Sequence, residues 1–321
     1  MRLKRFVKKR STTDRTRILI IGAGVNGSIV AVKMHNAGID VTLLARGKRF
    51  EQLQSEGVVI ENPFNNKRTV AKVPVIKVLE PDDRYDFIMV VVRKNQALEL
   101  LPLLASNQSP NIVFMGNNLL GPDEFIKALG RERVMMGSVY GAGKREGSVI
   151  RAMVIKSASA PFGEIDGRIT PRLKRLTQVL KQAGFKAEPT SQIVDHQTTH
   201  GAGVAIIASL AMKHGGDIRA LARSTDDLKL FVEGRREIHA LLRSLGRQVV
   251  PRSEVVLAKA PSFLQVAAMR LLLNSKFGEV GLAYHLSQAP DEMQQLIMEF
   301  RILVDQAGLL VPAIRKVLAG S

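Results

Sequence analysis

The sequence has no cysteine and no tryptophan, and aromatic residues make up only 5% of its 321 residues. The lack of cysteine excludes disulfides, thiolate metal sites, iron–sulfur clusters and a cysteine nucleophile. Proteins that bind nucleic acids by base stacking need aromatic side chains, so we do not expect a nucleic-acid partner.

Long apolar runs are also missing. The longest run, Val204 to Met212, has nine residues including Ser209, whereas a membrane-spanning helix needs about 20. The first residues, MRLKRFVKKR, are not followed by an apolar segment, so we expect no signal peptide and a cytoplasmic protein. The composition, 45% hydrophobic and 24% charged, is that of a globular protein, and the length suggests about two domains.

Acidic residues are scarce relative to basic ones, with 29 Asp and Glu against 47 Lys and Arg and a net charge of +18. Residues 1–17 contain eight of the basic residues and a single acid, Asp14. We interpret residues 1–16 as a disordered tail. The alternatives are an arm that binds nucleic acid or anionic lipid, and a short organelle-targeting segment.

Hydrophobic patterning predicts a change of architecture along the chain. Short apolar runs alternate with helical patterns as far as about residue 167, and only helical patterns follow residue 190. The predicted strands are 17–21, 41–45, 87–92, 111–115, 134–139 and 148–155. We therefore predict an α/β fold, in which a Rossmann-type doubly wound parallel sheet (residues 17–168) precedes an all-helical domain (residues 169–321).

A glycine-rich turn follows the first predicted strand. It reads Gly22-Ala23-Gly24-Val25-Asn26-Gly27 and leads into a helix, the context in which G-x-G-x-x-G indicates a dinucleotide site. We expect Gly22 to allow a tight turn, Gly24 to let the backbone approach a diphosphate, and Gly27 to let the helix pack on the strand. Val25 and Asn26 would present helix N–H groups to the diphosphate. The alternative is that these are ordinary turn glycines.

The end of the second predicted strand selects the cofactor. An NAD site usually has an acid there, but this segment carries Arg46, Lys48 and Arg49 and no acid. A guanidinium at Arg46 suits a 2′-phosphate, so we predict NADP(H). The alternative is a solvated loop of surface charge.

These motifs make the sequence resemble the ketopantoate reductase (2-dehydropantoate 2-reductase) family. The resemblance runs through IGAGVNGSIVAVKMHNAGIDVTLLARG, VVRKNQ at 91–96, GNNLLG at 116–121, and Glu292-Met293 followed by GLLVP at 308–312. It implies that Arg93 and Gln96 bind cofactor, with Arg93 in place of the family's phosphate-binding Lys. It also implies that Asn117 contacts substrate and nicotinamide, and that Glu292 binds substrate.

One departure from the family pattern concerns the proton donor. The family's general-acid Lys falls on Thr198 or Thr199, and the Asn that follows it falls on Gly203. His200 is a candidate replacement because its ordinary pKa lies near neutrality, and Thr199 could position a water instead. We predict no metal, since no glutamate lies between His196 and His200 and no third ligand is evident.

The predicted function is an NADPH-dependent reductase of a 2-oxo acid, either ketopantoate or a related carbonyl compound. The alternatives are a dehydrogenase of the same build with another substrate, a weakly active or inactive NADP(H)-binding sensor, and a surface binder that uses the basic arm. The expected partner is the small-molecule substrate. The sequence leaves the oligomeric state open, with a homodimer as one option.

Overall fold

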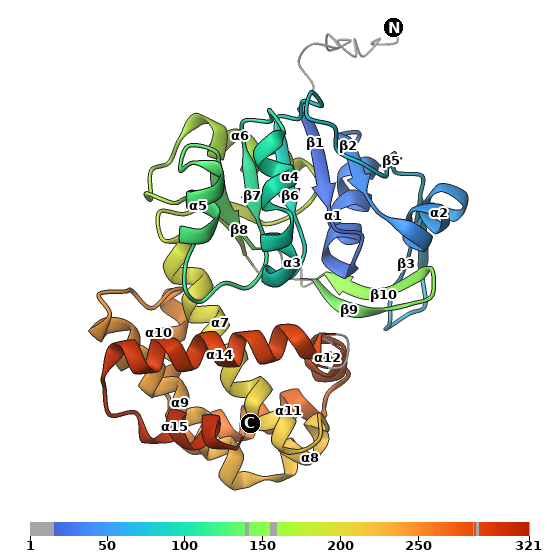
Figure 1. The fold of residues 1–321 in the computed structure, drawn as a ribbon. Helices are drawn as coiled ribbons and strands as arrows, with labels where there is room; N and C mark the ends of the chain where they lie inside the picture. The colour runs from blue at the N-terminus through green and yellow to red at the C-terminus, as the bar shows by residue number, and fades with distance from the viewer. Residues whose placement is uncertain (1–15, 139–140, 155–158, 285, 287–288, 321) are drawn as a thin grey trace, which may run out of the picture.

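The computed structural model describes residues 16–138, 141–154, 159–284, 286 and 289–320 (Figure 1). Except for residue 16, the predicted basic tail lies outside these residues. The strands are β1 (Arg17–Ile21), β2 (Asp40–Leu44), β3 (Val58–Glu61), β4 (Arg68–Ala71), β5 (Val75–Ile76), β6 (Phe87–Val90), β7 (Ile112–Phe114), β8 (Val134–Gly137), β9 (Gly141–Glu146), β10 (Val149–Val154), β11 (Ala160–Glu164) and β12 (Ala187–Pro189).

The helices of the sheet-bearing part are α1 (Val25–Asn36), α2 (Gly47–Glu56), α3 (Lys94–Glu99), α4 (Leu101–Ser106), α5 (Asp123–Leu129) and α6 (Pro171–Gln182). Those that follow are α7 (Ile193–Lys213), α8 (Ile218–Arg223), α9 (Thr225–Ser244), α10 (Arg252–Lys259), α11 (Ser262–Asn274), α12 (Lys276–Gly278), the π-helical turn η2 (Glu279–Ala283), α14 (Pro290–Ala307) and α15 (Pro312–Ala319).

The main sheet has eight strands in the order β12-β11-β8-β7-β6-β1-β2-β5. Its neighbouring strands pair in parallel except β8 and β11, which are antiparallel. Residues 18–20 of β1 are fully buried, as a strand covered on both faces requires. The predicted α/β fold with a parallel-dominated sheet and a helical C-terminal part is therefore confirmed.

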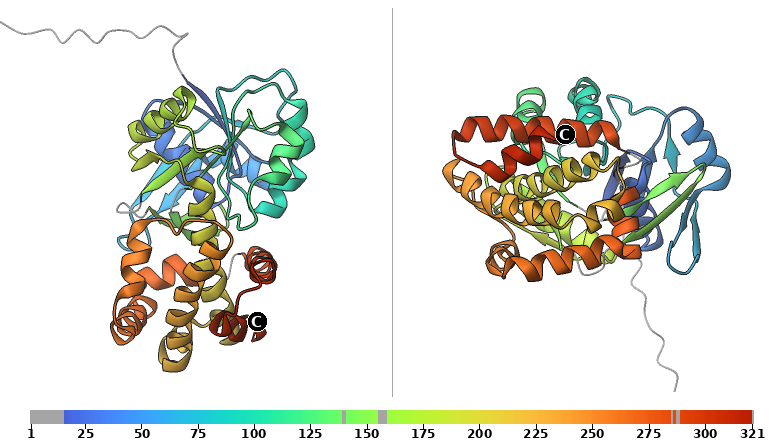
Figure 2. Two further views of the ribbon diagram at one scale, coloured as in Figure 1. Left: turned by 90° about the vertical axis from the view of Figure 1, so that its left-hand side faces the viewer. Right: turned by 90° about the horizontal axis from the view of Figure 1, so that it is seen from below.

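Helices cover both faces of this sheet, as the left view of Figure 2 shows. Side chains of α1 and α6 pack with Ile18 and Ile20 on one face. Side chains of α4 and α5 pack with Leu19 and Ile21 on the other. Because successive strand residues point to opposite faces, the strand RILII supplies both cores at once.

A second sheet, in the order β4-β3-β10-β9, lies against α1. Its buried residues Val58, Ala71, Ile150 and Ala152 belong to the same apolar cluster as α1. The helix is therefore enclosed by two sheets. Of these four strands, the sequence predicted only β10.

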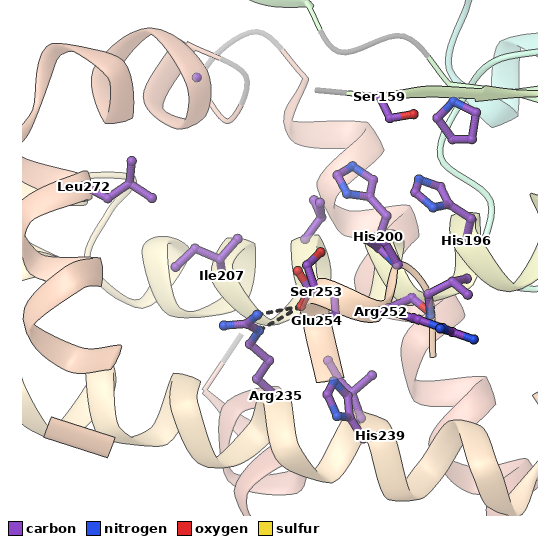
Figure 3. A pocket seen from close by; sticks show the side chains of 18 of the residues that line it. Ser159, His196, His200, Ile207, Arg235, His239, Arg252, Ser253, Glu254 and Leu272 are labelled. Carbon is purple, nitrogen blue, oxygen red and sulfur yellow. Dashed lines mark hydrogen bonds and ion pairs between the residues drawn. The ribbon is translucent and has the colours of Figure 1, made fainter. Parts of the chain in front are cut away.

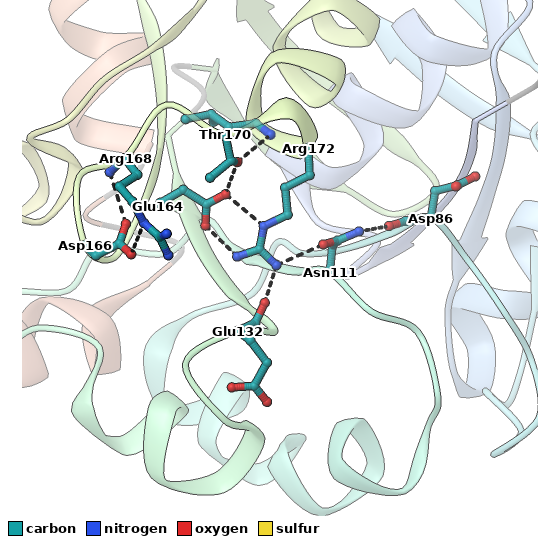
Figure 4. Close-up of polar contacts among 9 residues, drawn as sticks. Asp86, Asn111, Glu132, Glu164, Asp166, Arg168, Thr170 and Arg172 are labelled. Carbon is teal, nitrogen blue, oxygen red and sulfur yellow. Dashed lines mark hydrogen bonds and ion pairs between the residues drawn. The ribbon is translucent and has the colours of Figure 1, made fainter.

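A polar network around Arg172 of α6 lies at the amino-terminal ends of the parallel strands, opposite the ends that carry the glycine-rich turn (Figure 4). Its guanidinium binds both oxygens of the buried Glu164 carboxylate at 2.8 and 2.5 Å. It also donates to the Asn111 side chain at 3.0 Å and to the backbone carbonyl of Glu132. Asn111 in turn donates to the carbonyl of Asp86, so the network joins residues that precede β6, β7 and β8.

The main sheet extends beyond the predicted domain boundary at 168/169. Helix α6 packs on the sheet, and β12 forms its edge strand. Helix α7 follows, and its residues Ala205, Ile206 and Leu210 lie in a core shared with α9, α14 and α15. Within the described residues, no single helix is long and apolar enough to cross a membrane, and α10 and α11 meet that criterion only as a pair bent by 116°.

Candidate active site

The glycine-rich turn lies at the carboxyl end of β1 and is close-packed except at one position. A Cβ on Gly22, whose φ is +118°, would stand 2.3 Å from the carbonyl oxygen of Val91, and one on Gly27 would stand 1.8 Å from that of Gly22. A Cβ on Gly24 would meet nothing within 4 Å. The turn therefore leaves open space at the glycine where a dinucleotide phosphate approaches the backbone.

Helix α1 starts at this open position without a capping side chain. Gly24 is the N-cap, and the first turn contains no acid. The first N–H groups of a helix lack partners within the helix and attract anions. The Oδ1 atom of Asn26 is buried and has no hydrogen-bond partner among the described residues. The free N–H groups fit the phosphates of a bound dinucleotide, and the Asn26 Oδ1 is an acceptor that a donor group of such a ligand would satisfy.

The three cations after β2 differ in their exposure to solvent. Arg46 and Lys48 are exposed, but Arg49 is buried and donates to the carbonyl of Ser148 at 3.0 Å. Burial, followed by the charge of Arg145, lowers the pKa of Arg49 to about 10. Of these three cations, Arg46 and Lys48 are therefore the two that are accessible to the phosphate of a ligand.

Arg93 and Gln96 follow β6, which is the neighbour of β1. Gln96 is exposed. The Arg93 guanidinium forms an ion pair with Asp291 in the first turn of α14, and this hydrogen bond lowers the pKa of the Asp291 carboxyl. A cofactor phosphate at Arg93 would share the guanidinium with that carboxylate.

Asn117 and Glu292 are in direct contact although 175 residues separate them. The Asn117 Nδ2 donates to the Glu292 Oε1 at 2.8 Å, and both side chains are half-buried. Asn117 follows β7 and Gly116, where a Cβ would stand 2.9 Å from the Val92 carbonyl oxygen, and a Cβ on Gly22 would stand 2.7 Å from a Val92 side-chain carbon. Two residues taken from the family motifs therefore meet near the predicted cofactor site.

A buried ion pair joins α3 to α14, and its carboxylate also binds the loop that carries Asn117. Lys94 and Glu299 have side chains 6% and 7% exposed, with the Lys94 Nζ 2.8 Å from the Glu299 Oε1. The other Glu299 oxygen accepts from the Leu119 N–H at 3.1 Å, in the loop that carries Asn117. Sequence reasoning missed this pair. Its only signal was that Glu299 lies seven residues after Glu292 and so shares a face of α14.

Helix α7 presents different residues to its two sides. Thr198 faces the Asn117 loop, where its Oγ1 lies 3.3 Å from the Leu119 carbonyl and accepts from Arg247 at 2.6 Å. Thr199 and His200 instead line a cavity on another side of α7, and Figure 3 shows the His200 ring there. Thr199 donates to the Asp195 carbonyl at 2.8 Å.

This space, called the α7 cavity here, has a volume of about 1010 Å³. It is bounded by α7, α9, α10, α11, α12, η2 and residues in and next to β11 and β12. Neither Asn117 nor Glu292 is among the described residues that line it. The cavity contains a third histidine, His239, and the ion pair between Arg235 and Glu254, none of which the sequence singled out.

Burial determines the charge of two of these histidines. It lowers the pKa of His196 and of His239 below the ordinary value, although the nearby Glu254 carboxylate acts in the opposite direction on both. Both rings are therefore neutral near pH 7. In the part of the chain that the structure describes, no group of three or more His, Asp or Glu side chains could hold a metal ion.

Comparison with known proteins finds matches to the N-terminal half of the chain. A family model described as ketopantoate reductase PanE/ApbA matches residues 18–166. The 2-dehydropantoate 2-reductase of Archaeoglobus fulgidus is 29% identical over 178 residues, which are 55% of this chain and 57% of that enzyme. The enzyme of the same name from Pyrococcus horikoshii is 28% identical over 134 residues, or 42% of this chain and 43% of its own. The matches therefore span about half the length of these relatives.

Solved structures share the whole fold. D-mandelate dehydrogenase with NADH and anilino(oxo)acetate superposes with a TM-score of 0.77 at 16% identity, covering 95% of this chain and 96% of that one. The 2-dehydropantoate 2-reductase of Geobacter metallireducens gives 0.76 at 17% identity, covering 95% and 98%. At such low identity these structures show a common architecture.

Proposed function

We propose that this chain, whose residues 18–166 match the ketopantoate reductase family model, is an NADPH-dependent reductase that converts a 2-oxo acid to the 2-hydroxy acid. The observation that carries the proposal is the contact of Asn117 with Glu292 beside the glycine-rich turn. The turn alone would also suit a nucleotide-binding sensor. A polar pair that the family uses for substrate distinguishes an enzyme from that alternative.

The residues that would hold the cofactor lie at the carboxyl ends of β1 and β2. Gly22, Gly24 and Gly27 shape the turn, and the N–H groups of Val25 and Asn26 would bind the diphosphate. Arg46 would bind the 2′-phosphate, supported by its exposure and by the absence of an acid at the end of β2. When bound, the reduced nicotinamide supplies the hydride.

The reaction adds a hydride to the carbonyl carbon and a proton to its oxygen, so the protein must polarise the carbonyl and deliver one proton. Asn117 would donate a hydrogen bond to the substrate while Glu292 fixes the Asn117 amide. His200, exposed on α7, and Thr199 line the α7 cavity and not the Asn117 side of the helix, so a proton from His200 would have to reach the substrate through water. Each of these roles stays a prediction.

The test of activity is NADPH oxidation by the purified protein with a panel of 2-oxo acids that includes ketopantoate, followed by NADPH absorbance. We expect turnover with at least one of them. NADPH binding without turnover on any 2-oxo acid would contradict the reductase and favour the sensor.

Cofactor choice is tested separately by fluorescence titration. NADPH should bind at least about tenfold more tightly than NADH, because one charged phosphate contact contributes about 1.5–3 kcal/mol. Arg46→Ala should erase most of that preference. The control Arg131→Ala removes another exposed arginine, which precedes β8 at the amino-terminal ends of the strands and so lies away from the glycine-rich turn. This variant should preserve the preference for NADPH. Equal dissociation constants for the two cofactors would refute the NADP(H) prediction.

The domain division and oligomeric state also stay proposals. We place the boundary between β12 and α7, since α6 packs on the main sheet and β12 is one of its strands.

A homodimer is supported by large apolar side chains exposed on α11, among them Phe263 at 71% and Leu271 at 75%. Sedimentation analysis of the wild type and of Leu271→Glu tests it, with a monomeric wild type as the contrary result. The cytoplasmic location stays a prediction.

A further inference from the structure

Two neighbouring acids in the first turn of α14 each contact a polar group at the carboxyl edge of the main sheet. Asp291 is paired with Arg93, which follows β6. Glu292 accepts the hydrogen bond from Asn117, which follows the adjacent strand β7. Figure 1 shows α14 running below α3 at this edge. The start of α14 therefore occupies two polar groups that a ligand at the edge would need.

Arg93 lies beside the glycine-rich turn. A Cβ on Gly22 would stand 2.3 Å from the carbonyl oxygen of Val91, so the turn touches the segment that leads from β6 to Arg93. The Arg93 side chain is 30% exposed. Ligands of open parallel sheets bind outside the carboxyl ends of the strands, which is where this guanidinium lies. A phosphate that binds Arg93 must therefore displace Asp291 or share the guanidinium with it.

The carboxylate of Asp291 is charged near pH 7 and holds Arg93 with moderate strength. The hydrogen bond from Arg93 lowers the pKa of Asp291 below its ordinary value. The Asn95 Nδ2 lies 3.5 Å from the Asp291 Oδ2. Because the Asp291 side chain is 46% exposed, water screens the pair, and we expect the closed contact to be favoured about fivefold, at the upper end for surface ion pairs.

The rest of α14 is anchored independently of Asp291. Leu296 and Phe300 are buried in the core of the helical part. The Glu299 Oε1 lies 2.8 Å from the Lys94 Nζ, which joins the middle of α14 to α3. A change of partner at the arginine therefore requires only side chains to move, while the helix keeps its place. The exchange costs little more than the surface ion pair itself.

We propose that Asp291 is an intramolecular competitor of the cofactor phosphate, which weakens cofactor binding by holding Arg93. The inference rests on the proposed function, because it requires a phosphate-bearing cofactor at the glycine-rich turn. A contact that is closed about five times as often as it is open leaves Arg93 available in about one molecule in six, which raises the Kd about sixfold. Asp291 acts through Arg93 and is therefore a positioning residue.

The test measures the Kd of NADPH by fluorescence titration of the wild type and of Asp291→Asn at neutral pH and physiological salt. We expect the Kd of the variant to be about fivefold lower, because a neutral amide competes weakly for the guanidinium. The matched control Asp305→Asn removes an acid that is paired with Arg315 near the other end of the same helix. It lies about 21 Å along the helix from Asp291, well beyond the screening length of about 8 Å, so its Kd should stay within about 1.5-fold of wild type.

Two further readouts separate competition from a structural effect. In an Arg93→Ala background, Asp291→Asn should change the Kd by less than about 1.5-fold, because the competition needs the guanidinium. Asp291→Asn should also lower the free energy of unfolding while it tightens NADPH binding, whereas damage to the fold would weaken both. The same titrations with NADH identify the phosphate. Tightening of both cofactors indicates the diphosphate and tightening of NADPH alone indicates the 2′-phosphate, and either pattern supports the competition.

The inference and the reductase activity can fail separately, because the titrations contain no 2-oxo acid. Tighter NADPH binding by Asp291→Asn in a protein that reduces no 2-oxo acid would support the inference and refute the reductase. Turnover of a 2-oxo acid together with an unchanged or higher Kd in Asp291→Asn would overturn the inference and leave the reductase standing. An equal fall of the Kd in Asp305→Asn, or the same fall in the absence of Arg93, would also overturn it.

Discussion

The buried pair Lys94–Glu299 should make a large and asymmetric contribution to stability. At 2.8 Å and an effective dielectric constant near 20, the attraction is about 6 kcal/mol before desolvation is subtracted. Lys94→Met leaves the Glu299 carboxylate buried with only neutral donors, and removing one partner of such a pair costs about 3–5 kcal/mol. Glu299→Gln leaves Lys94 within 3.4 Å of Glu124, whose side chain is 57% exposed, and should cost about 1.5–3 kcal/mol.

Urea unfolding followed by far-ultraviolet circular dichroism measures these losses as free energies of unfolding. The double variant should lose at least about 1 kcal/mol less than the sum of the single losses, because no uncompensated charge then remains buried. Lys127→Met, at an exposed lysine of α5, is the matched control and should stay within about 0.5 kcal/mol of wild type. If Lys94→Met were as mild as Lys127→Met, Lys94 would be solvated in solution and the reasoning would fail.

Three further predictions test other parts of the molecule. His200→Ala should lower turnover about 10²-fold or more without changing the Kd of NADPH, and full turnover in a folded variant would remove the histidine from the mechanism. Arg172→Ala should lower the free energy of unfolding by about 3 kcal/mol in urea titrations, since Glu164 is left buried, and a loss below about 1 kcal/mol would contradict this. The lowered pKa of Asp291 means that its pairing with Arg93 stabilises the fold fully above the ordinary Asp value of about 3.9 and is lost as pH falls through the lower folded value. The stability difference between wild type and Asp291→Asn should therefore shrink below about pH 4, and a pH-independent difference would be the contrary result.

The sequence predicted those parts of the fold whose signals are local. Apolar runs such as RILII in β1 identify buried parallel strands, and the glycine spacing identifies the turn after it. The second sheet escaped because β3 and β4 have four residues each, while β9 reads GAGKRE and contains glycines and charges that are unusual in strands.

The candidate site, too, could be predicted from the sequence only in part. Motif resemblance singled out Asn117 and Glu292 as ligand-binding residues, but their direct contact was not predicted, because no periodicity links residues 175 positions apart. The salt bridge of Lys94 and the burial of Arg49 depend on which element packs above each side chain. The helical pattern of α7 could not show that Thr198 and Thr199 face different surroundings, since successive helical residues differ by about 100° and the neighbouring elements decide what each side meets.

The enclosure of α1 between two sheets has a consequence for how a ligand is received. Its residues from Gly27 to Val32 are all buried, and its apolar contacts come from the main sheet on one side and from Val58 and Ile150 on the other. Such a helix opens only when much of the surrounding core opens, so we expect its amide protons to be among the slowest to exchange with solvent. Its N-terminal N–H groups are thus fixed in direction before any anion arrives. Binding there requires little ordering of the backbone, and association can depend on diffusion and charge rather than on a rearrangement of the turn.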